Sequence, residues 1–286
     1  MKLLLVINPV SGDNDKEPLI KKIKDYLGSQ NDLDIYKTNG KDDAERLRKY
    51  FQKKYDRVLV MGGDGTIKSV AETMGDNPLS MGIIPAGSAN GLAHDLELPL
   101  SVDEAIPVAL GSKTRKIDAI CLNGQLGLHI SDLGLNAELI KKYESSFFRG
   151  KLGYALNSIP TLFQSEGPYE FTIETKDITY THSGIMLAFA NSNKFGTGAV
   201  VNPEGKIDDG VFEILVFKKI DVIEIFKTLQ NAENLSSDFV EIIPVKQARV
   251  RTEKPVDFQI DGEYCHTVSE VNAYIAPQKL EIAIAE

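Results

Sequence analysis

Cysteine is scarce in this sequence, and long apolar runs are missing from it. The two cysteines, Cys121 and Cys265, lie far apart, so the chain offers neither a disulfide framework nor a cysteine zinc site, and a reducing compartment is the simplest interpretation. The apolar run Leu3–Ile7 is too short for the core of a signal peptide, and no run approaches the length of a membrane-spanning helix. We therefore expect a cytoplasmic protein without a transmembrane segment.

Basic residues are also in the minority, with 32 Lys and Arg against 41 Asp and Glu, which gives a formal net charge of −9. An acidic chain of this kind argues against a general nucleic-acid binder and against strong electrostatic adhesion to anionic membranes. Hydrophobic residues make up 42% of the 286 positions, which is enough to bury a sizeable core in one large domain or two ordinary ones.

Three glycines surround one carboxylate directly after a predicted buried strand, Val58–Met61. The loop is Gly62-Gly63-Asp64-Gly65-Thr66, and the apolar spacing that follows it fits one face of a helix. Glycines let the backbone approach a ligand closely, and the start of a helix presents unpaired N–H groups that suit phosphate. This stretch therefore predicts an anion site around which the rest of the chain is organised.

Two common phosphate-binding motifs do not fit this loop. A Walker A loop needs Gly-Lys-Ser/Thr, and no Gly-Lys pair of the chain is followed by Ser or Thr. The dinucleotide fingerprint counted from Gly63 would need glycine where Lys68 stands. A tight turn with glycines for packing only remains an alternative. In a binding site, Asp64 would hold Mg²⁺ against phosphates or take a proton from an attacking hydroxyl, and we expect it at an exposed edge of the loop.

Apolar runs alternate with helical patterns along the first 115 residues. They predict four strands: Leu3–Ile7, Leu33–Lys37, Val58–Met61 and Met81–Ile84. Asp42 and Glu45 resemble the capping box of a helix that runs through Phe51. Such alternation predicts a parallel α/β sheet, in which ligands bind beyond the carboxyl ends of the strands. Four loops are therefore expected at one sheet edge: 8–12, near 38, 62–66 and 85–91.

After residue 115 the pattern changes to short strands separated by turn signals. Asn123-Gly124 is a strong signal for a two-residue hairpin turn. The strands predicted beyond it include 169–175, 178–190, 211–217, 246–252, 256–260 and 271–284 in two pieces. This half is expected to be mostly antiparallel, as a β-sandwich or a related two-sheet domain. We place the domains at 1–118 and 119–286, and we leave open whether the last strands return to the first domain.

Acidic residues in the second half each have a structural and a functional interpretation. Asp118 lies in an apolar strand, where a salt bridge with Arg115 or Lys116 is slightly favoured. Asp208-Asp209-Gly210 and Asp261-Gly262-Glu263 are ordinary turn sequences, although the first could also hold a hard cation and the second could present a carboxylate. The four histidines lack metal-ligand spacing and no G-x-S-x-G is present, so zinc chemistry and serine hydrolysis have little support.

Together these motifs resemble the diacylglycerol kinase catalytic-domain family, which includes bacterial soluble lipid kinases and the sphingosine and ceramide kinases. The matching motifs occur in family order and span most of the chain: Asn8-Pro9-x-Ser11-Gly12, Gly62-Gly63-Asp64-Gly65-Thr66, Pro85-Ala86-Gly87-Ser88-Ala89-Asn90, Asp208-Asp209-Gly210 and Asp261-Gly262-Glu263. The glycine–aspartate loop alone is also similar to NAD kinases and phosphofructokinases. The resemblance implies an α/β domain of that type and a β-sandwich domain, with the active site between them.

The resemblance also implies which residues bind ATP and Mg²⁺. It implies ATP contacts at these positions: Asn8, Pro9, Ser11, Gly12, Thr38, Gly62, Gly63, Gly65, Thr66, Gly87, Ser88, Asn90 and Asp261. It implies Mg²⁺ near Asp64 and a structural Mg²⁺ at Asp209, assisted by main-chain oxygens of Lys206 and Val211. Glu263 matches the family's proton acceptor, so the catalytic carboxylates are Asp64 and Glu263, and which of them is the base stays open.

We therefore expect a kinase that uses ATP and Mg²⁺ to phosphorylate a hydroxyl of a diacylglycerol- or sphingoid-type lipid, transiently at the membrane surface. Many diacylglycerol kinases have Asp where this chain has Gly91, and Ser88 with Ala89 is closer to the sphingosine-kinase form of the loop. The alternatives are an NAD kinase-like phosphotransferase and a nucleotide-binding module without turnover. A homodimer stays open, and no nucleic-acid partner is expected.

Overall fold

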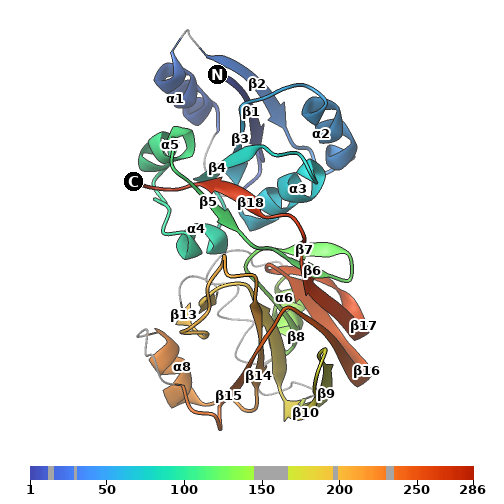
Figure 1. Cartoon of the computed structure of the whole chain (residues 1–286). Coiled ribbons are helices and arrows are strands. Elements are labelled where there is room, and N and C mark those ends of the chain that lie inside the picture. The colour runs from blue at the N-terminus through green and yellow to red at the C-terminus, as the bar shows by residue number, and fades with distance from the viewer. Residues whose placement is uncertain (12–15, 29–30, 145–166, 196–198, 230–234) are drawn as a thin grey trace. The chain divides into compact units, whose positions relative to one another are not determined.

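The computed structural model describes residues 1–11, 16–28, 31–144, 167–195, 199–229 and 235–286 of the chain (Figure 1). These residues form two compact units. The first unit is Met1–Ile117 together with Gln278–Glu286, and the second unit is Asp118–Pro277. Each unit has its own sheet and its own core.

The first unit contains a six-stranded sheet in the order β2-β1-β3-β4-β18-β5. Its strands are β1 (Lys2–Ile7), β2 (Asp32–Lys37), β3 (Arg57–Gly62), β4 (Ser80–Pro85), β5 (Thr114–Ile117) and β18 (Leu280–Ala283). All neighbours are parallel except β5, which runs antiparallel to β18. The predicted parallel α/β sheet is confirmed, and the last strand, red in Figure 1, lies between β4 and β5.

Helices cover both faces of this sheet. They are α1 (Glu17–Leu27), α2 (Asp43–Phe51), α3 (Asp64–Met74), α4 (Gly91–Asp95) and α5 (Val102–Leu110). Alternate side chains of β1 and β3 pack with Ile20 and Ile23 of α1 and with Ile106 of α5 in one core. Helices α2 and α3 pack against each other, α3 also packs on β3, and Figure 1 shows this pair on the opposite face of the sheet. Burial of strand residues on both faces explains why these strands read as continuous apolar runs.

The capping box expected before α2 is wrong. Asp42 has a φ of 55° and makes no side-chain capping bond. The neighbouring carboxylate of Asp43 instead accepts hydrogen bonds from the backbone N–H groups of Asn39 and Gly40, at 3.1 and 2.7 Å. The loop before the helix is therefore closed by the first helical residue, one position later than the pattern indicated.

The second unit contains a ten-stranded antiparallel sheet with the main order β15-β14-β11-β8-β16-β17-β6-β7, and β9 pairs with both β10 and β16. The strands are β6 (Ile120–Leu122), β7 (Gln125–Gly127), β8 (Ile130–Gly134), β9 (Tyr169–Glu174), β10 (Thr179–Gly184), β11 (Met186–Ala190), β14 (Phe212–Phe217), β15 (Val240–Val245), β16 (Gln247–Ile260) and β17 (Glu263–Ile275). A separate two-stranded ribbon pairs β12 (Lys194–Phe195) with β13 (Ala199–Val200), and the helices are α6 (Leu135–Glu144) and α8 (Val222–Leu229). The predicted antiparallel β domain is confirmed.

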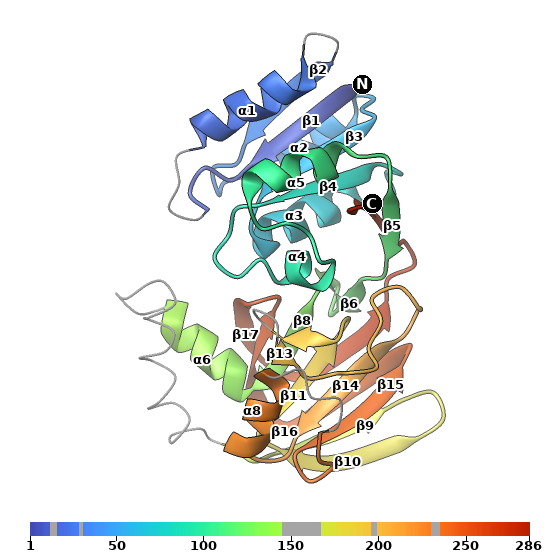
Figure 2. The same ribbon diagram turned by 90° about the vertical axis from the view of Figure 1, so that its left-hand side faces the viewer.

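The long strand β16 organises this second sheet. It pairs with β17 over most of its length, with β9 near its start and with β8 near its end. Helix α6 packs against β8, β16 and β17, as Figure 2 shows. The hairpin of β16 and β17 turns at Asp261-Gly262, so this turn lies at the end of a strand that pairs with three neighbouring strands.

Among the described residues, no helix is long and apolar enough to cross a membrane.

Candidate active site

The carboxyl ends of four parallel strands bring the expected loops of the first unit together. Strand register places Ile7 beside Lys37 and Met61, and places Gly62 beside Pro85. The residues that follow these strand ends therefore share one edge of the sheet. The Thr38 N–H donates to the carbonyl of Ile7 at 2.8 Å, which fixes Thr38 next to the loop that begins at Asn8.

Asn8 connects the first loop to the start of α3. Its Nδ2 donates to Thr66 Oγ1 at 3.3 Å, and its Oδ1 accepts the Val10 N–H at 3.1 Å. The Ser11 hydroxyl donates to the Asn8 carbonyl at 2.9 Å, and Pro9 is exposed. Gly12 lies outside the described residues. The loop after β1 is thus folded tightly around one asparagine.

The glycine loop after β3 leads directly into α3. Gly63 precedes the helix in an extended conformation, and its carbonyl accepts the N–H groups of Thr66 and Ile67 at 3.0 and 3.1 Å. The N–H groups of Asp64 and Gly65, the first two helical residues, have no carbonyl to bond within the helix. Gly62 must lack a side chain, because a Cβ there would lie 2.6 Å from Cβ and Oγ1 of Thr66.

The second small-residue loop is in direct contact with the first. A Cβ on Gly87 would lie 2.4 Å from the Cα of Gly63. Asn90, with a φ of 53°, closes the second loop on itself, since its Oδ1 accepts the Gly87 N–H at 2.8 Å and its Nδ2 donates to the Gly87 carbonyl at 3.0 Å. Ser88, between them, is exposed. The loops therefore form one surface of closely packed backbone.

Asp64 joins these two loops and is not at an exposed edge. Its carboxylate oxygens accept the N–H groups of Gly91 and Leu92, at 2.9 and 3.0 Å, at the start of α4. The side chain is half-buried, so the expectation of an exposed loop position was wrong. The sequence could not indicate this, because the partner N–H groups belong to a helix that begins 27 residues later. Asp64 holds the glycine loop against the second loop.

In the second unit, Asp118 supports the turn that carries Asp209. The Asp118 side chain is buried, its Oδ2 accepts the Gly210 N–H at 2.7 Å, and its own N–H donates to the Ile207 carbonyl at 2.7 Å. Asp209 is exposed, and one of its oxygens accepts the Val211 N–H at 3.0 Å. The turn therefore presents one carboxylate beside the backbone of residues 206–211.

The Asp261-Gly262 turn is anchored on its Asp261 side. Both residues have positive φ, 51° and 86°, as a two-residue hairpin turn of this hand requires. The Asp261 carboxylate accepts the N–H groups of Leu128 and His129 at 2.8 and 2.9 Å. Glu263, the first residue of β17, is exposed. Asp261 thus fixes the turn, and Glu263 is the carboxylate that the turn presents.

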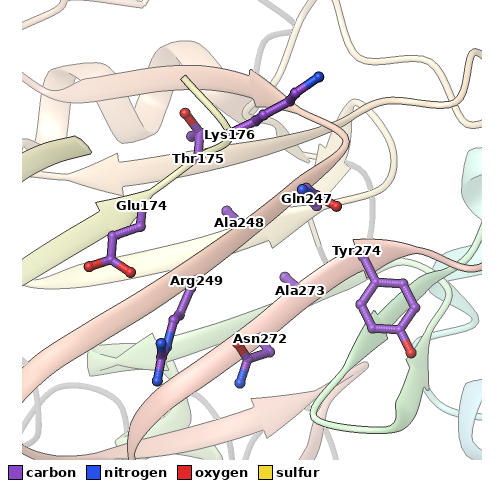
Figure 3. A pocket seen from close by; sticks show the side chains of 9 residues that line it. All are labelled: Glu174, Thr175, Lys176, Gln247, Ala248, Arg249, Asn272, Ala273 and Tyr274. Atoms are coloured by element: carbon purple, nitrogen blue, oxygen red, sulfur yellow. The ribbon is translucent and has the colours of Figure 1, made fainter. Parts of the chain in front are cut away.

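A shallow groove on the second unit is lined by other residues. It has a volume of about 350 Å³ and is lined by residues of β9, β16 and β17 and by the turn after β9 (Figure 3). Ala248, Ala273 and Arg249 are among its lining residues, and Arg249 is paired with Glu270 at 2.7 Å. None of the residues expected in the site lines this groove. In the described parts of the chain, no three His, Cys, Asp or Glu side chains are grouped as a metal site.

Two family models match the chain in succession. One, described as the diacylglycerol kinase catalytic domain, matches residues 2–122. The other, the YegS C-terminal NAD kinase beta sandwich-like domain, matches residues 132–284, which is more than half of the chain. The chain belongs to the diacylglycerol kinase catalytic-domain family.

Two relatives are similar to this chain over most of its length. A "Probable lipid kinase YegS-like" protein of Chromohalobacter salexigens is 29% identical over 218 residues, which covers 73% of this chain and 70% of that protein. A "Diacylglycerol kinase" of Bacillus subtilis is 24% identical over 270 residues and covers 91% and 89%.

Solved structures resemble this family member over nearly the whole chain. A diacylglycerol kinase from Bacillus anthracis has a TM-score of 0.75 at 19% identity and covers 99% of this chain and 97% of that one. An NAD kinase from Archaeoglobus fulgidus in complex with ATP has a TM-score of 0.56 at 11% identity and covers 100% and 94%. At these identities the likeness shows the fold, which confirms the expected NAD kinase-like architecture.

Proposed function

We propose that this protein is a lipid kinase that transfers the terminal phosphoryl group of ATP to a lipid hydroxyl, with Mg²⁺ as the metal. The observation that carries the proposal is the succession of the two family domains along residues 2–122 and 132–284. The names of the two relatives, a lipid kinase and a diacylglycerol kinase, agree with it. The acceptor is a diacylglycerol- or sphingoid-type lipid that the enzyme meets at the membrane surface.

The backbone of the first unit suits the phosphates of ATP. The Gly63–Gly87 contact leaves no room for side chains, so a ligand could approach the main chain of both loops closely. The first N–H groups of α3 and the positive end of its dipole favour anionic oxygens. Asn8, Thr38, Thr66 and Ser88 surround this backbone with groups that can donate hydrogen bonds.

Mg²⁺ would be held by single carboxylates rather than by an all-protein cage. Asp209 with the main-chain oxygens of Lys206 and Val211 offers oxygen ligands of the kind that Mg²⁺ prefers, with water completing its shell. A metal bound near the phosphates would neutralise part of their negative charge during transfer. A second Mg²⁺ near Asp64 would share that residue with its two backbone donors.

The two candidate bases differ in their surroundings. Both oxygens of Asp64 already accept a backbone N–H, whereas Glu263 is exposed on the first residue of a strand. Each Asp64 oxygen keeps a further lone pair, but its orientation is fixed by the contact with α4, whereas an exposed side chain can turn towards an acceptor hydroxyl, so this difference favours Glu263. We assign Glu263 as the residue that accepts the hydroxyl proton and Asp64 as the residue that orders the nucleotide loops.

The test of this proposal is an acceptor screen with radiolabelled ATP. The purified protein is incubated with Mg²⁺ and a total lipid extract, then with diacylglycerol, sphingosine and ceramide vesicles, and the labelled product is identified. Label in a phosphorylated lipid supports the proposal. Label in NADP from added NAD would replace it with an NAD kinase, which shares this fold. ATP binding without transfer to any acceptor would indicate a nucleotide-binding module.

A further inference from the structure

A chain of buried polar side chains leads from strand β8 to the Asp261-Gly262 turn. Asp132 on β8 lies directly opposite Gln259 on β16. Its Oδ2 accepts Gln259 Nε2 at 2.5 Å and Asn136 Nδ2 at 2.6 Å. The other end of the Gln259 side chain, Oε1, accepts the N–H of Gly262 at 2.7 Å. The amide of Gln259 therefore connects a buried carboxylate to the backbone of the turn.

These side chains are buried on the face of the sheet opposite the main apolar core. Asp132 and Gln259 are 0% and 1% exposed. Their strand neighbours Leu133, Phe258 and Ile260 belong to the main apolar core of the unit. Since side chains alternate along a strand, the polar pair faces the opposite side, where α6 packs and contributes Asn136.

Burial of this carboxylate is unfavourable for stability. Burial raises the pKa of Asp132 to about 7, although N–H groups of Asn136, Gln259 and the Ala137 backbone oppose the shift. An apolar pair of similar volume would avoid the desolvation penalty. What the polar pair provides instead is a directional contact, because the two hydrogen bonds of the Gln259 amide, one to Asp132 and one to Gly262, restrict its orientation.

The hydrogen bond between Gln259 and Gly262 lies next to the residue that we propose as the base. The turn has two side-chain anchors on either side of one peptide: the Asp261 carboxylate holds the N–H groups of Leu128 and His129, and Gln259 holds the N–H of Gly262. Glu263 follows immediately. Displacement of a reacting group by about 1 Å can lower a rate by about 10²-fold.

We propose that Gln259 and Asp132 are positioning residues for phosphoryl transfer, which hold the Asp261-Gly262 turn so that Glu263 reaches the acceptor hydroxyl. This inference rests on the proposed function, in which Glu263 accepts the proton. Neither residue touches a reacting atom. Gln259 acts through the backbone of Gly262, and Asp132 acts by orienting the Gln259 amide so that its oxygen, not its nitrogen, faces the turn.

The first test removes the connection. Gln259→Leu is expected to lower kcat for lipid phosphorylation at least 10-fold while the KM for ATP changes less than about 2-fold. All assigned ATP contacts except Asp261 lie in loops of the first unit, and Asp261 keeps its own hydrogen bonds to Leu128 and His129 in this variant. Hydrogen exchange of the Gly262 amide should become faster in the same variant. Gln247→Leu is the matched control, because it makes the same change at an exposed position of the same strand. A folded Gln259→Leu variant with wild-type kcat would overturn the inference.

The second test exchanges the two polar groups, and it stands even if Gln259→Leu does not fold. In Gln259→Glu two carboxylates face each other in a buried site, so activity should persist only at acidic pH, where the pair holds a proton, and should fall as the pH rises. The exchange Asp132→Asn with Gln259→Glu restores one donor and one acceptor. It should return kcat to within about 3-fold of wild type and should restore the wild-type pH profile.

Titratable side chains also lie on the elements packed around this pair, and His129, which directly precedes β8, is buried. Of the charged side chains of α6 whose contacts are described, Glu138 accepts the Tyr169 hydroxyl at 2.5 Å and Lys141 pairs with Asp257 at 2.8 Å. If the exchanged variant is no more active than Gln259→Glu alone, the inference is wrong. A wild-type enzyme that phosphorylates no lipid overturns the proposed function, whereas an active wild type with a fully active Gln259→Leu overturns this inference alone.

Discussion

Asp64 shows how one carboxylate can order a loop and also take part in a reaction. Asp64→Asn keeps one oxygen acceptor but places an amide nitrogen against the other backbone N–H of α4. Loss of that hydrogen bond should lower the free energy of unfolding by about 1–2 kcal/mol. If Asp64 also contacts metal or nucleotide, kcat should fall by at least about 10²-fold. Denaturant unfolding and steady-state kinetics on the same preparation separate the two effects. A destabilised variant with wild-type turnover would show that the residue serves structure alone.

Asp132 makes the stability of the second unit depend on pH. Its pKa in the folded chain is about 7, against an ordinary value of 3.8. The folded state therefore binds more protons than the unfolded state between these values, and stability is lost as the pH rises through that window. Asp132→Asn cannot ionise, so its Tm advantage over wild type should be smallest near pH 4, grow towards pH 7 and level off above it. Thermal melts across this range measure the difference in Tm, and Asp177→Asn, at an exposed position between β9 and β10, is the control. A difference that does not change with pH would contradict the raised pKa.

At the scale of elements, apolar runs bounded by turn residues made it possible to predict strands from the sequence. The expected strand at 58–61 is β3 (Arg57–Gly62) and that at 81–84 is β4 (Ser80–Pro85), because burial on both faces leaves an uninterrupted run. The expected strands 246–252 and 256–260 are instead one strand, β16. A shift in its register with β17 between Arg251 and Val256 accommodates Pro255, which reads as a break in the sequence.

The contact between the two glycine loops can be tested by adding one methyl group. Gly87→Ala would place a carbon 2.4 Å from the Cα of Gly63, so the loops must separate. We expect a loss of about 1–3 kcal/mol in stability and at least a 10-fold loss in ATP affinity, measured by calorimetry. Gly28→Ala is the control in the same unit: its φ of 63° makes alanine strained, but nothing lies within 4 Å. Equal ATP affinity in both variants would mean that the loop contact does not shape the nucleotide site.

At the scale of the whole chain, motif order was more informative than any single motif. The glycine–aspartate loop fits several kinase families, whereas five motifs in sequence indicated one family, which the two domain models confirm. The buried pair Asp132 and Gln259 could not be found in this way. Gln259 occupies the polar position of an alternating strand, and Asp132 lies in an otherwise buried strand. Their connection depends on pairing between strands more than 120 residues apart in the chain.

Glu263 is the base in the proposed reaction, and Glu263→Gln tests that role. Glutamine keeps the shape and the hydrogen-bonding capacity of Glu263 but cannot accept the hydroxyl proton. ATP affinity, which we assign mainly to the first unit, should stay roughly constant, while kcat should fall by about 10²–10⁴-fold. Stability should change by less than about 0.5 kcal/mol, because the side chain is exposed. Calorimetry with ATP and single-turnover phosphorylation measure both quantities. If ATP binding weakens as much as turnover, Glu263 contacts nucleotide or metal, and Asp64 becomes the base. If neither quantity changes, Glu263 is not the base, and its assignment to the site is wrong.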